Sequence, residues 1–301
     1  MKACFPAAAL MLFAACSIPA GGASPAAPLP EAPVSAFLAQ CEGKDGWNDP
    51  APPFRLYGNT YGVGTCGMTA LLVVTPDGLV LVDVGTEEAA PLVAENIRRL
   101  GFQLSDVKWI VASHEHWDHV GGVAGMQRLT GAKVAALASA KDAFENGRHN
   151  PIDPQGADQH FPPIRVDRVL ADGDTVALGG TVLTAHATPA HSPGSTSWTW
   201  RACEGAICQT ITYADSATIL STGQYRFSDH PDYVADVRRG LEAIGGLPCG
   251  ILATPHPSAS ALHERLAAGI AADGSACRTY AEQAKARFEE RLASEAGSAA
   301  R

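Results

Sequence analysis

Short hydrophobic runs separated by turn residues mark the first half of the chain. Residues 69–75 and 79–85 are rich in valine and leucine and are separated by Pro-Asp-Gly, so they predict a β-hairpin. Residues 86–102 predict a helix, because Thr86 can cap it, acidic residues follow, arginines come near its end and Gly101 closes it. The first half therefore begins with strands and continues with a helix.

The next segments continue the alternation of strand and helix. Residues 107–113 predict a buried strand, residues 119–131 a second helix and residues 132–139 another strand. A polar, proline-rich stretch from Asn146 to Pro163 predicts a long loop, and loops of this kind often border a functional site.

The second half repeats the order of strands first, followed by helices and strands. Two such halves favour two packed β-sheets with helices on their outer faces, which is an α/β fold. The expected strands are Val166–Leu170, Thr181–His186, Ser195–Trp200, Gln209–Tyr213 and 250–254, and the expected helices are Pro231–Ile244, Ala259–Ala268 and Cys277–Ala293.

The composition restricts the possible binding partners more than it restricts the fold. The chain has 301 residues, enough for one large domain or two modest ones, and a formal net charge of −9. Because an acidic protein offers no basic surface that could gather phosphates, we expect no nucleic-acid partner.

The N-terminus has the composition of an export segment. Lys2 precedes an apolar run at 7–15 that is too short to span a bilayer. We expect a signal peptide at 1–23; the alternative is a lipoprotein signal that ends before Cys16 and leaves a lipid anchor there. The rest of the chain is then expected to form a linker at 24–40, a single domain at 41–293 and a flexible tail at 294–301.

The cysteines agree with export to the periplasm or the medium. Of the eight, Cys4 and Cys16 fall in the leader, and the remaining even number suggests three disulfides. No Cys-x-x-Cys or Cys/His finger spacing occurs, so a cysteine zinc site is not expected. Sequence alone leaves many pairings open. We expect those that are local in sequence: Cys41–Cys66, Cys203–Cys208 and Cys249–Cys277.

The segment HEHWDH follows the predicted strand at 107–113 and gathers three of the ten histidines. His114 and His116 are two residues apart, so on an extended backbone their side chains point the same way and can reach one ion. Asp118 and His119 follow as the chain turns into a helix and can face a second ion. Nitrogen and carboxylate ligands without thiolate suit zinc in an open catalytic site. We interpret Glu115 as solvated, or as supporting a ligand without binding metal.

Two later segments can complete such a centre. His191 lies in a Pro/Gly loop between two predicted strands, and His256 follows a predicted buried strand between two prolines. His186, at a strand end, is a further candidate for contact with the site. Four histidines lack a comparable context and are expected on the surface: His149, His160, His230 and His263.

Five segments together resemble a known family: HEHWDH, LVLVDVGT, TPAHSPGSTSW, YADSA and TPHPSAS. In order and spacing they are similar to the metallo-β-lactamase superfamily, most of all to its subclass B3, from about Trp47 to Cys277. The resemblance implies a four-layer αβ/βα sandwich with two mixed β-sheets, helices on the outer faces and the site at one edge. Glu115 and Ala190 depart from the usual B3 pattern without removing a ligand.

The resemblance also implies a set of site residues. One zinc would be held by His114, His116 and His191, and the other by Asp118, His119 and His256. Asp83 would support the metal loop without binding metal. Candidates for contact with the substrate are Ser216, Ser221 or Thr222, and Gln155.

The implied activity is zinc-dependent hydrolysis of the β-lactam amide of penicillins, cephalosporins or carbapenems, which confers antibiotic resistance. Two Zn²⁺ ions about 3.5–4 Å apart would share a water and lower its pKa to roughly 7. Asp118, with His114 and His116, would form the catalytic set, and Asp118 would orient the attacking hydroxide. We expect a monomer that acts on a small molecule and does not span the membrane.

Two rival functions stay open on the sequence. A lactonase or a glyoxalase II-like thioesterase on the same dinuclear scaffold uses a further aspartate that bridges the metals, and Asp215 could be that residue. A non-catalytic, membrane-anchored zinc-binding protein is the other, although a complete ligand set with an open position is unnecessary for storage. Fold similarity alone does not decide among them.

Overall fold

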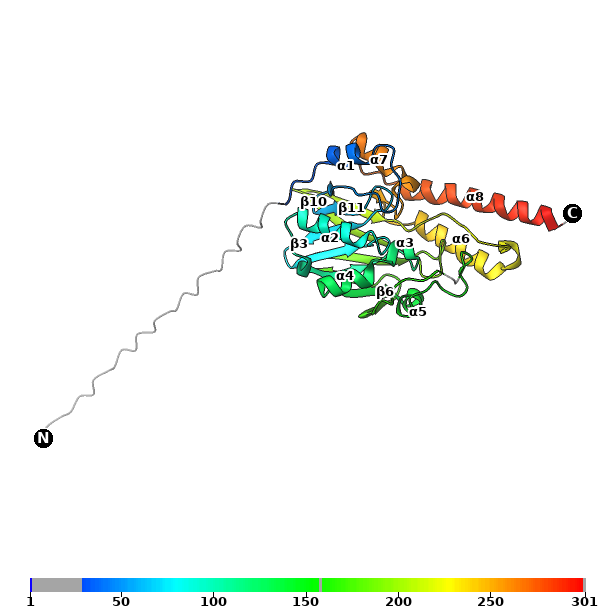
Figure 1. The fold of residues 1–301 in the computed structure, drawn as a ribbon, viewed down its shortest axis with the longest axis horizontal. Coiled ribbons are helices and arrows are strands. Elements are labelled where there is room, and N and C mark those ends of the chain that lie inside the picture. Colours follow the sequence, from blue (N-terminus) through cyan, green and yellow to red (C-terminus); the bar gives the residue numbers. More distant parts are fainter. Residues whose placement is uncertain (2–28, 157–158, 300–301) are drawn as a thin grey trace.

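The computed structural model describes residues 1, 29–156 and 159–299. The expected signal peptide at 1–23, including Cys4 and Cys16, lies outside the described residues. From residue 29 onward two β-sheets pack against each other and carry helices on their outer faces (Figure 1). The predicted two-sheet α/β sandwich is confirmed.

The first sheet is mixed and contains seven strands in sequential order. Neighbouring strands from β1 to β4 are antiparallel, whereas neighbouring strands from β4 to β7 are parallel. Its strands are β1 (Phe54–Tyr57), β2 (Thr60–Gly62), β3 (Leu71–Thr75), β4 (Gly78–Val82), β5 (Val107–Val111), β6 (Lys133–Leu137) and β7 (Arg168–Leu170).

The second sheet is also mixed and has five strands in the order β12-β11-β10-β9-β8. Only the β11–β12 pair is parallel. Its strands are β8 (Thr175–Leu178), β9 (Thr181–Ala187), β10 (Thr196–Glu204), β11 (Ile207–Tyr213) and β12 (Ile251–Ala253).

Helices close the sandwich on both sides. The α-helices are α1 (Val34–Cys41), α2 (Ala90–Arg99), α3 (Trp117–Val120), α4 (Val123–Thr130), α5 (Ala138–Asn146), α6 (Pro231–Gly245), α7 (Leu262–Ala267) and α8 (Ala276–Ala299). The 3₁₀ turns are η1 (Leu104–Asp106), η2 (Phe227–Asp229) and η3 (Pro257–Ser260).

Alternation along the strands of the first sheet divides the interior into layers. On β4, Leu79 and Leu81 face the core shared with α2 and α4, whereas Val80 and Val82 face the core between the two sheets. Successive strand residues point to opposite faces, so one apolar strand serves two cores. A third core packs α6 and α8 against the outer face of the second sheet.

Several elements differ from the sequence-based expectation. The expected linker at 24–40 is wrong for its last part, because α1 forms there and buries Phe37, whose ring lies 4.3 Å from that of Phe54. The expected tail at 294–301 is wrong up to residue 299, because α8 continues there with an Arg291–Glu295 pair one turn apart. Strands β1, β2 and β8 and helix α5 were not predicted; each is short and depends on a neighbouring sheet or core.

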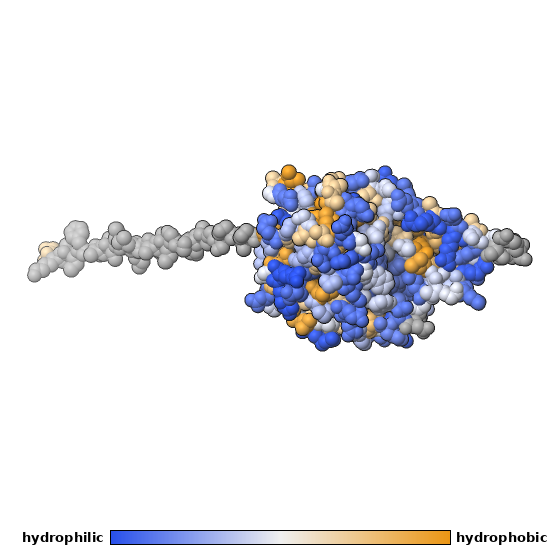
Figure 2. Space-filling model, turned by 45° about the horizontal axis from the view of Figure 1, so that its top comes forward, coloured by the Kyte–Doolittle hydropathy of each residue, from blue (hydrophilic) through white to orange (hydrophobic). Residues whose placement is uncertain are grey.

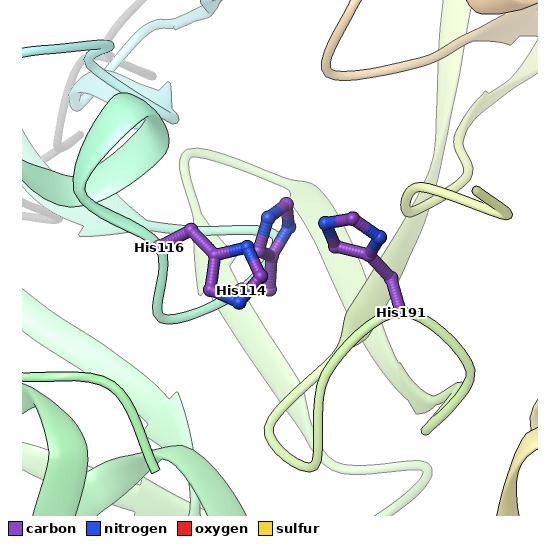
Figure 3. Close-up of side chains that lie close together, drawn as sticks. All are labelled: His114, His116 and His191. Atoms are coloured by element: carbon purple, nitrogen blue, oxygen red, sulfur yellow. The ribbon is translucent and has the colours of Figure 1, made fainter. Parts of the chain in front are cut away.

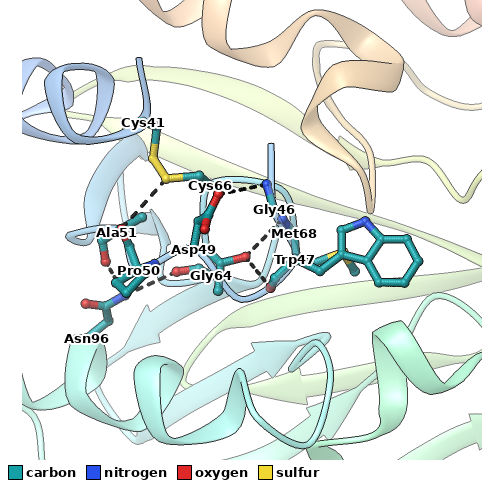
Figure 4. Close-up of a disulfide and its surroundings, with 11 residues drawn as sticks. Cys41, Gly46, Trp47, Asp49, Pro50, Ala51, Gly64, Cys66, Met68 and Asn96 are labelled. Atoms are coloured by element: carbon teal, nitrogen blue, oxygen red, sulfur yellow. Dashed lines mark hydrogen bonds between the residues drawn. A yellow bond between two sulfur atoms is a disulfide. The ribbon is translucent and has the colours of Figure 1, made fainter. Parts of the chain in front are cut away.

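The three expected disulfides are present. Cys41–Cys66 joins the end of α1 to the loop after β2, where Asn96 of α2 also donates hydrogen bonds to the carbonyls of Ala51 and Gly64 (Figure 4). This disulfide restrains segments outside the regular sheet ladders. The other two pairs are Cys203–Cys208, across the β10–β11 hairpin, and Cys249–Cys277, from the start of β12 to α8.

The face of the molecule seen in Figure 2 is mainly polar. Figure 2 shows a largely hydrophilic face interrupted by small hydrophobic patches. Among residues 29–156 and 159–299, no helix has the length and hydrophobicity needed to cross a bilayer.

Candidate metal centre

One edge of the sandwich collects the ends of strands from both sheets. The HEHWDH segment begins after β5 and runs into α3, and Asp83 follows the neighbouring parallel strand β4. From the second sheet come the loop between β9 and β10 with His191, the residues after β11, and His256 after β12. Strands from two halves of the chain therefore deliver polar side chains to one place.

His114, His116 and His191 form the first group. Their ligand atoms lie within 4.8 Å of one another, and all three side chains are buried. Figure 3 shows the three imidazoles turned toward one another, two from the loop after β5 and one from the β9–β10 loop. The structure thus brings together residues that are 75 positions apart or more, as expected for one metal site.

His114, Asp118 and His119 form a second group beside the first. His256 adjoins it, since its Nε2 lies 3.3 Å from Oδ2 of Asp118 and its ring centre 4.9 Å from that of His119. All six residues expected to bind metal therefore meet at one edge, and His114 lies between the two groups.

Each buried histidine of the first group is anchored through one ring nitrogen. Nδ1 of His114 lies 2.8 Å from Oδ1 of Asp215, and Nε2 of His116 lies 2.6 Å from Oδ2 of Asp153. Nδ1 of His191 donates to the carbonyl of Thr218. An acceptor on one nitrogen fixes the tautomer and leaves the lone pair of the other for a metal.

Asp83 supports the second group from behind. It adopts a left-handed backbone with φ of 58°, and its carboxylate accepts from the Ser113 amide and hydroxyl and from the Tyr213 hydroxyl, each at 2.7 Å. Its Oδ2 also lies 3.4 Å from Nδ1 of His119. These bonds hold the loop that carries the motif, which is the position expected of Asp83.

The ionisation of the site suits a cation. Burial and the neighbouring histidines hold the pKa of His114 well below its usual range, and burial and His116 lower the pKa of His191 to about 3. Both imidazoles are therefore neutral, the form that binds metal. Despite opposing burial, Asp118 and Asp83 raise the pKa of His119 to about 10. The carboxylates thus favour a positive charge at this point, which a metal ion would supply in place of the proton.

An unpaired nitrogen gives a second test of the fit. Nε2 of His114 is buried and has no hydrogen-bond partner among the described residues. Because an unsatisfied buried polar atom is costly, the residues present fit a metal ion bound at the first group.

His149 overturns one expectation, because it is only 2% exposed rather than on the surface. Together with His116 and Asp153 it forms a third group with closely spaced ligand atoms. However, the His116 and His149 rings stack at 4.2 Å and 20°, so their planes do not meet at a nearby point that both lone pairs could reach. We interpret His149 as a residue that packs on the His116 ring, while Asp153 anchors His116.

The remaining histidines lie outside the two groups. His160 and His230 are exposed as expected, and His263 is half-buried against Phe37. His186 is on β9 and pairs with the Thr199 hydroxyl at 2.8 Å, away from the metal ligands.

The substrate candidates differ in their surroundings. Nε2 of Gln155 lies 3.3 Å from Nε2 of His191, so the long loop reaches the site. Ser216 is buried, and the Ser221 hydroxyl is held by the Tyr225 carbonyl at 3.3 Å and by Arg291 at 2.6 Å. Thr222, which follows Ser221 directly, has an exposed side chain.

Asp153, in the long loop that borders the site, was not identified as a support from sequence. For Glu115 the sequence left two alternatives, and its complete burial excludes the solvated one and leaves the supporting one. The composition of the loop hinted at a role for its residues, but no spacing pointed to Asp153.

Comparisons with known proteins agree with this geometry. The family model described as "Metallo-beta-lactamase superfamily" matches residues 63–264. Metallo-β-lactamase MIM-1 from Novosphingobium pentaromativorans is 52% identical, with a TM-score of 0.86 over 88% of this chain and 99% of that one. MEM-A1, a subclass B3 metallo-β-lactamase from a soil metagenome library, is 40% identical, with a TM-score of 0.80 over 84% and 100%.

Two curated relatives have lower sequence identity to this chain and carry a different name, hydroxyacylglutathione hydrolase. A hydroxyacylglutathione hydrolase of Jannaschia sp. is 28% identical over 68% of this chain and 67% of that protein. One from Anaeromyxobacter dehalogenans is 29% identical over 74% and 73%. The family model covers more than half of the chain, and the histidine and aspartate groups lie together at one edge of the sandwich. The chain therefore belongs to the metallo-β-lactamase superfamily.

Proposed function

We propose that the protein hydrolyses the amide bond of β-lactams and so confers resistance to these antibiotics. The observation that carries the proposal is the pair of metal-binding groups that meet at His114, in a chain 40–52% identical to MIM-1 and MEM-A1 over 84–88% of its length. The fold by itself would allow several hydrolases, so the argument rests on the site together with this similarity.

The donor set suits two Zn²⁺ ions. His114, His116 and His191 would hold one, and Asp118, His119 and His256 the other. When bound, zinc supplies Lewis acidity that polarises a carbonyl and lowers the pKa of water to about 7. Nitrogen and oxygen donors without thiolate are typical of catalytic zinc sites with an open position.

Asp118 is the residue placed to handle protons. Although burial opposes it, the charge and hydrogen bonds of His119 and His256 hold the pKa of Asp118 well below its usual range. Its carboxylate therefore stays ionised, and it can orient an attacking water by accepting a hydrogen bond from it. We also assign to it the passage of the proton of that water to the departing lactam nitrogen. His114 and His116 hold the reacting centre in place beside it.

The substrate carboxylate needs a donor near the metal centre. We assign this role to the hydroxyl of Ser216 and to that of Ser221 or Thr222, with Gln155 as a further contact. Thr222 is favoured among them because its side chain is exposed and its hydroxyl makes only a long contact, 3.5 Å, with the Pro154 carbonyl. Its amide donates to the same carbonyl at 2.9 Å, beside Gln155.

The disulfides support a proposal for the cellular location. Three disulfides are consistent with an oxidising, non-cytoplasmic compartment. We infer that the chain acts as a monomer in the periplasm or the medium after removal of residues 1–23, or is held by a lipid at Cys16.

A thioesterase of the glyoxalase II type is the second candidate, because the curated relatives at 28–29% identity are hydroxyacylglutathione hydrolases. That function would use Asp215 as a metal bridge. Its Oδ1 lies 2.8 Å from Nδ1 of His114, whereas its buried Oδ2 has no hydrogen-bond partner among the described residues, so the zinc stoichiometry of an Asp215→Asn variant decides between an anchor and a bridge.

Purified, zinc-loaded protein assayed in parallel on a chromogenic cephalosporin, a carbapenem, a lactone and S-lactoylglutathione tests the proposal. We expect turnover of the β-lactams that a chelator abolishes and added zinc restores. Turnover of the lactone or thioester with none of any β-lactam would overturn it.

A further inference from the structure

Glu115 lies between two metal-binding residues and faces away from both. Its side chain is fully buried, and among the described residues no lysine or arginine pairs with it. Its Oε2 accepts from the Ser192 hydroxyl at 2.7 Å, and its Oε1 accepts from the Gly194 amide at 2.9 Å. A buried carboxylate is costly, so these two bonds offset its desolvation.

The partners of Glu115 belong to the loop that displays His191. Ser192 follows His191 directly, and Gly194 is two residues further on. The fit is close, since a Cβ at position 194 would lie 2.3 Å from Oε2 of Glu115. Glu115 therefore joins the segment with His114 and His116 to the loop with the third histidine.

Other contacts do not replace this connection. The Thr196 amide donates to the Ser113 carbonyl at 2.6 Å, but Thr196 already belongs to β10, beyond the loop. Within the loop, the His191 ring is oriented by the Thr218 carbonyl. That bond sets the direction of the His191 ring. The distance between the loop with His191 and the segment with His114 and His116 is set instead by the hydrogen bonds of Glu115.

We propose that Glu115 is a positioning residue that fixes the separation between His191 and the His114–His116 segment, and so sets the metal affinity of the first group. The proposal rests on the metal centre of the proposed function but not on its substrate. Because the hydrogen bonds of Glu115 go to the loop that carries His191 and none goes to Asp118, we expect its effect to be confined to the site that contains His191.

Three variants test the proposal: Glu115→Ala, Glu115→Gln and Ser192→Ala. Glu87→Ala is the control, since the Glu87 side chain is exposed. Zinc and Co²⁺ are titrated into the metal-free full chain against a competing chelator. Displacing one ligand-supporting contact typically weakens a metal site about 10–100-fold. We expect that loss for one equivalent in Glu115→Ala, a smaller loss in Glu115→Gln and Ser192→Ala, and none in Glu87→Ala.

A double-variant cycle identifies the site that is affected. His191→Ala provides the reference in which the first group lacks its third histidine. If Glu115 acts through His191, adding Glu115→Ala to His191→Ala changes the affinity of neither remaining equivalent by more than about threefold. Equal losses in both backgrounds would contradict the proposal.

A structural role alone would give another pattern. It would lower the melting temperature of Glu115→Ala equally with and without zinc and leave both affinities unchanged, which would overturn the proposal. If Glu115→Ala does not fold, Ser192→Ala and Glu115→Gln decide by the same readout. Failure of the wild type to cleave β-lactams would overturn the proposed function but leave these titrations interpretable.

Discussion

Nε2 of His116 lies 2.6 Å from Oδ2 of Asp153, and both side chains are buried. The carboxylate is delivered by the long loop between α5 and β7, 37 residues from its partner. His149 covers the other face of His116 by stacking on it. His116, a proposed metal ligand, is thus held by a carboxylate on one side and by a ring on the other.

Asp153→Ala is therefore expected to weaken zinc binding at the first group by about 10–100-fold, because His116 loses the acceptor that fixes its tautomer. Competition with a chromophoric chelator measures this. His149→Phe keeps the stacked ring and should change the affinity by less than about threefold. Asp142→Asn, whose side chain is 92% exposed, is the control. An unaltered affinity in Asp153→Ala would exclude the anchoring role.

Asp215→Asn separates an anchor of His114 from a metal bridge. If Asp215 anchors His114, the variant should still bind two zinc ions at saturation, with affinity lowered about tenfold or more. Metal analysis of the zinc-saturated variant after removal of free ion gives the stoichiometry. Loss of one equivalent at saturating zinc would favour a bridge and with it the thioesterase reading.

Removal of metal should lower the free energy of unfolding. Without metal, Nε2 of His114 stays buried without a partner, and the Asp118 carboxylate lacks the positive charge of the ion. Free zinc at about 100 times its Kd contributes about 2.7 kcal/mol per site. For a domain of this size, that corresponds to a fall in Tm of roughly 5–10 °C for each site emptied. Thermal unfolding with EDTA, with excess zinc and after readdition of zinc tests this, and a Tm that does not respond contradicts it.

The Cys249–Cys277 disulfide closes a loop with a sequence separation of 28 and joins the start of β12 to α8. Loop-closure entropy predicts that Cys249→Ser with Cys277→Ser lowers the free energy of unfolding by about 3–4 kcal/mol. Urea unfolding measures it. Because the bond lies behind the second sheet, zinc stoichiometry of the folded variant should be unchanged.

Thr222→Val tests recognition of the substrate carboxylate. Loss of one hydrogen bond to a charged group costs about 1.5–3 kcal/mol, so KM for a β-lactam should rise about tenfold or more while kcat changes little. Steady-state kinetics on a cephalosporin measure both constants. Ser221→Ala is the comparison, since its hydroxyl is already engaged by Arg291 and Tyr225. If only Ser221→Ala raises KM, the assignment moves to Ser221.

The sequence by itself determined the features that depend on neighbouring residues. The short apolar runs at 79–85 and 107–113 predicted strands, and they are continuous because both faces of these strands pack in hydrophobic cores. The two-residue spacing of His114 and His116 predicted that they face one ion, since side chains on a strand point alternately to two faces. The local cysteine pairs also required only short loops to close.

Only the tertiary structure decided the contacts that support these ligands. Glu115 meets Ser192 across 77 residues, Asp153 meets His116 across 37, and Asp215 meets His114 across 101. An isolated acidic residue in a loop has the same local pattern whether it is solvated or buried, so sequence could not distinguish these roles. Helix α1 likewise forms because Phe37 packs on Phe54 and Cys41 bonds to Cys66, which are contacts that local propensity does not contain.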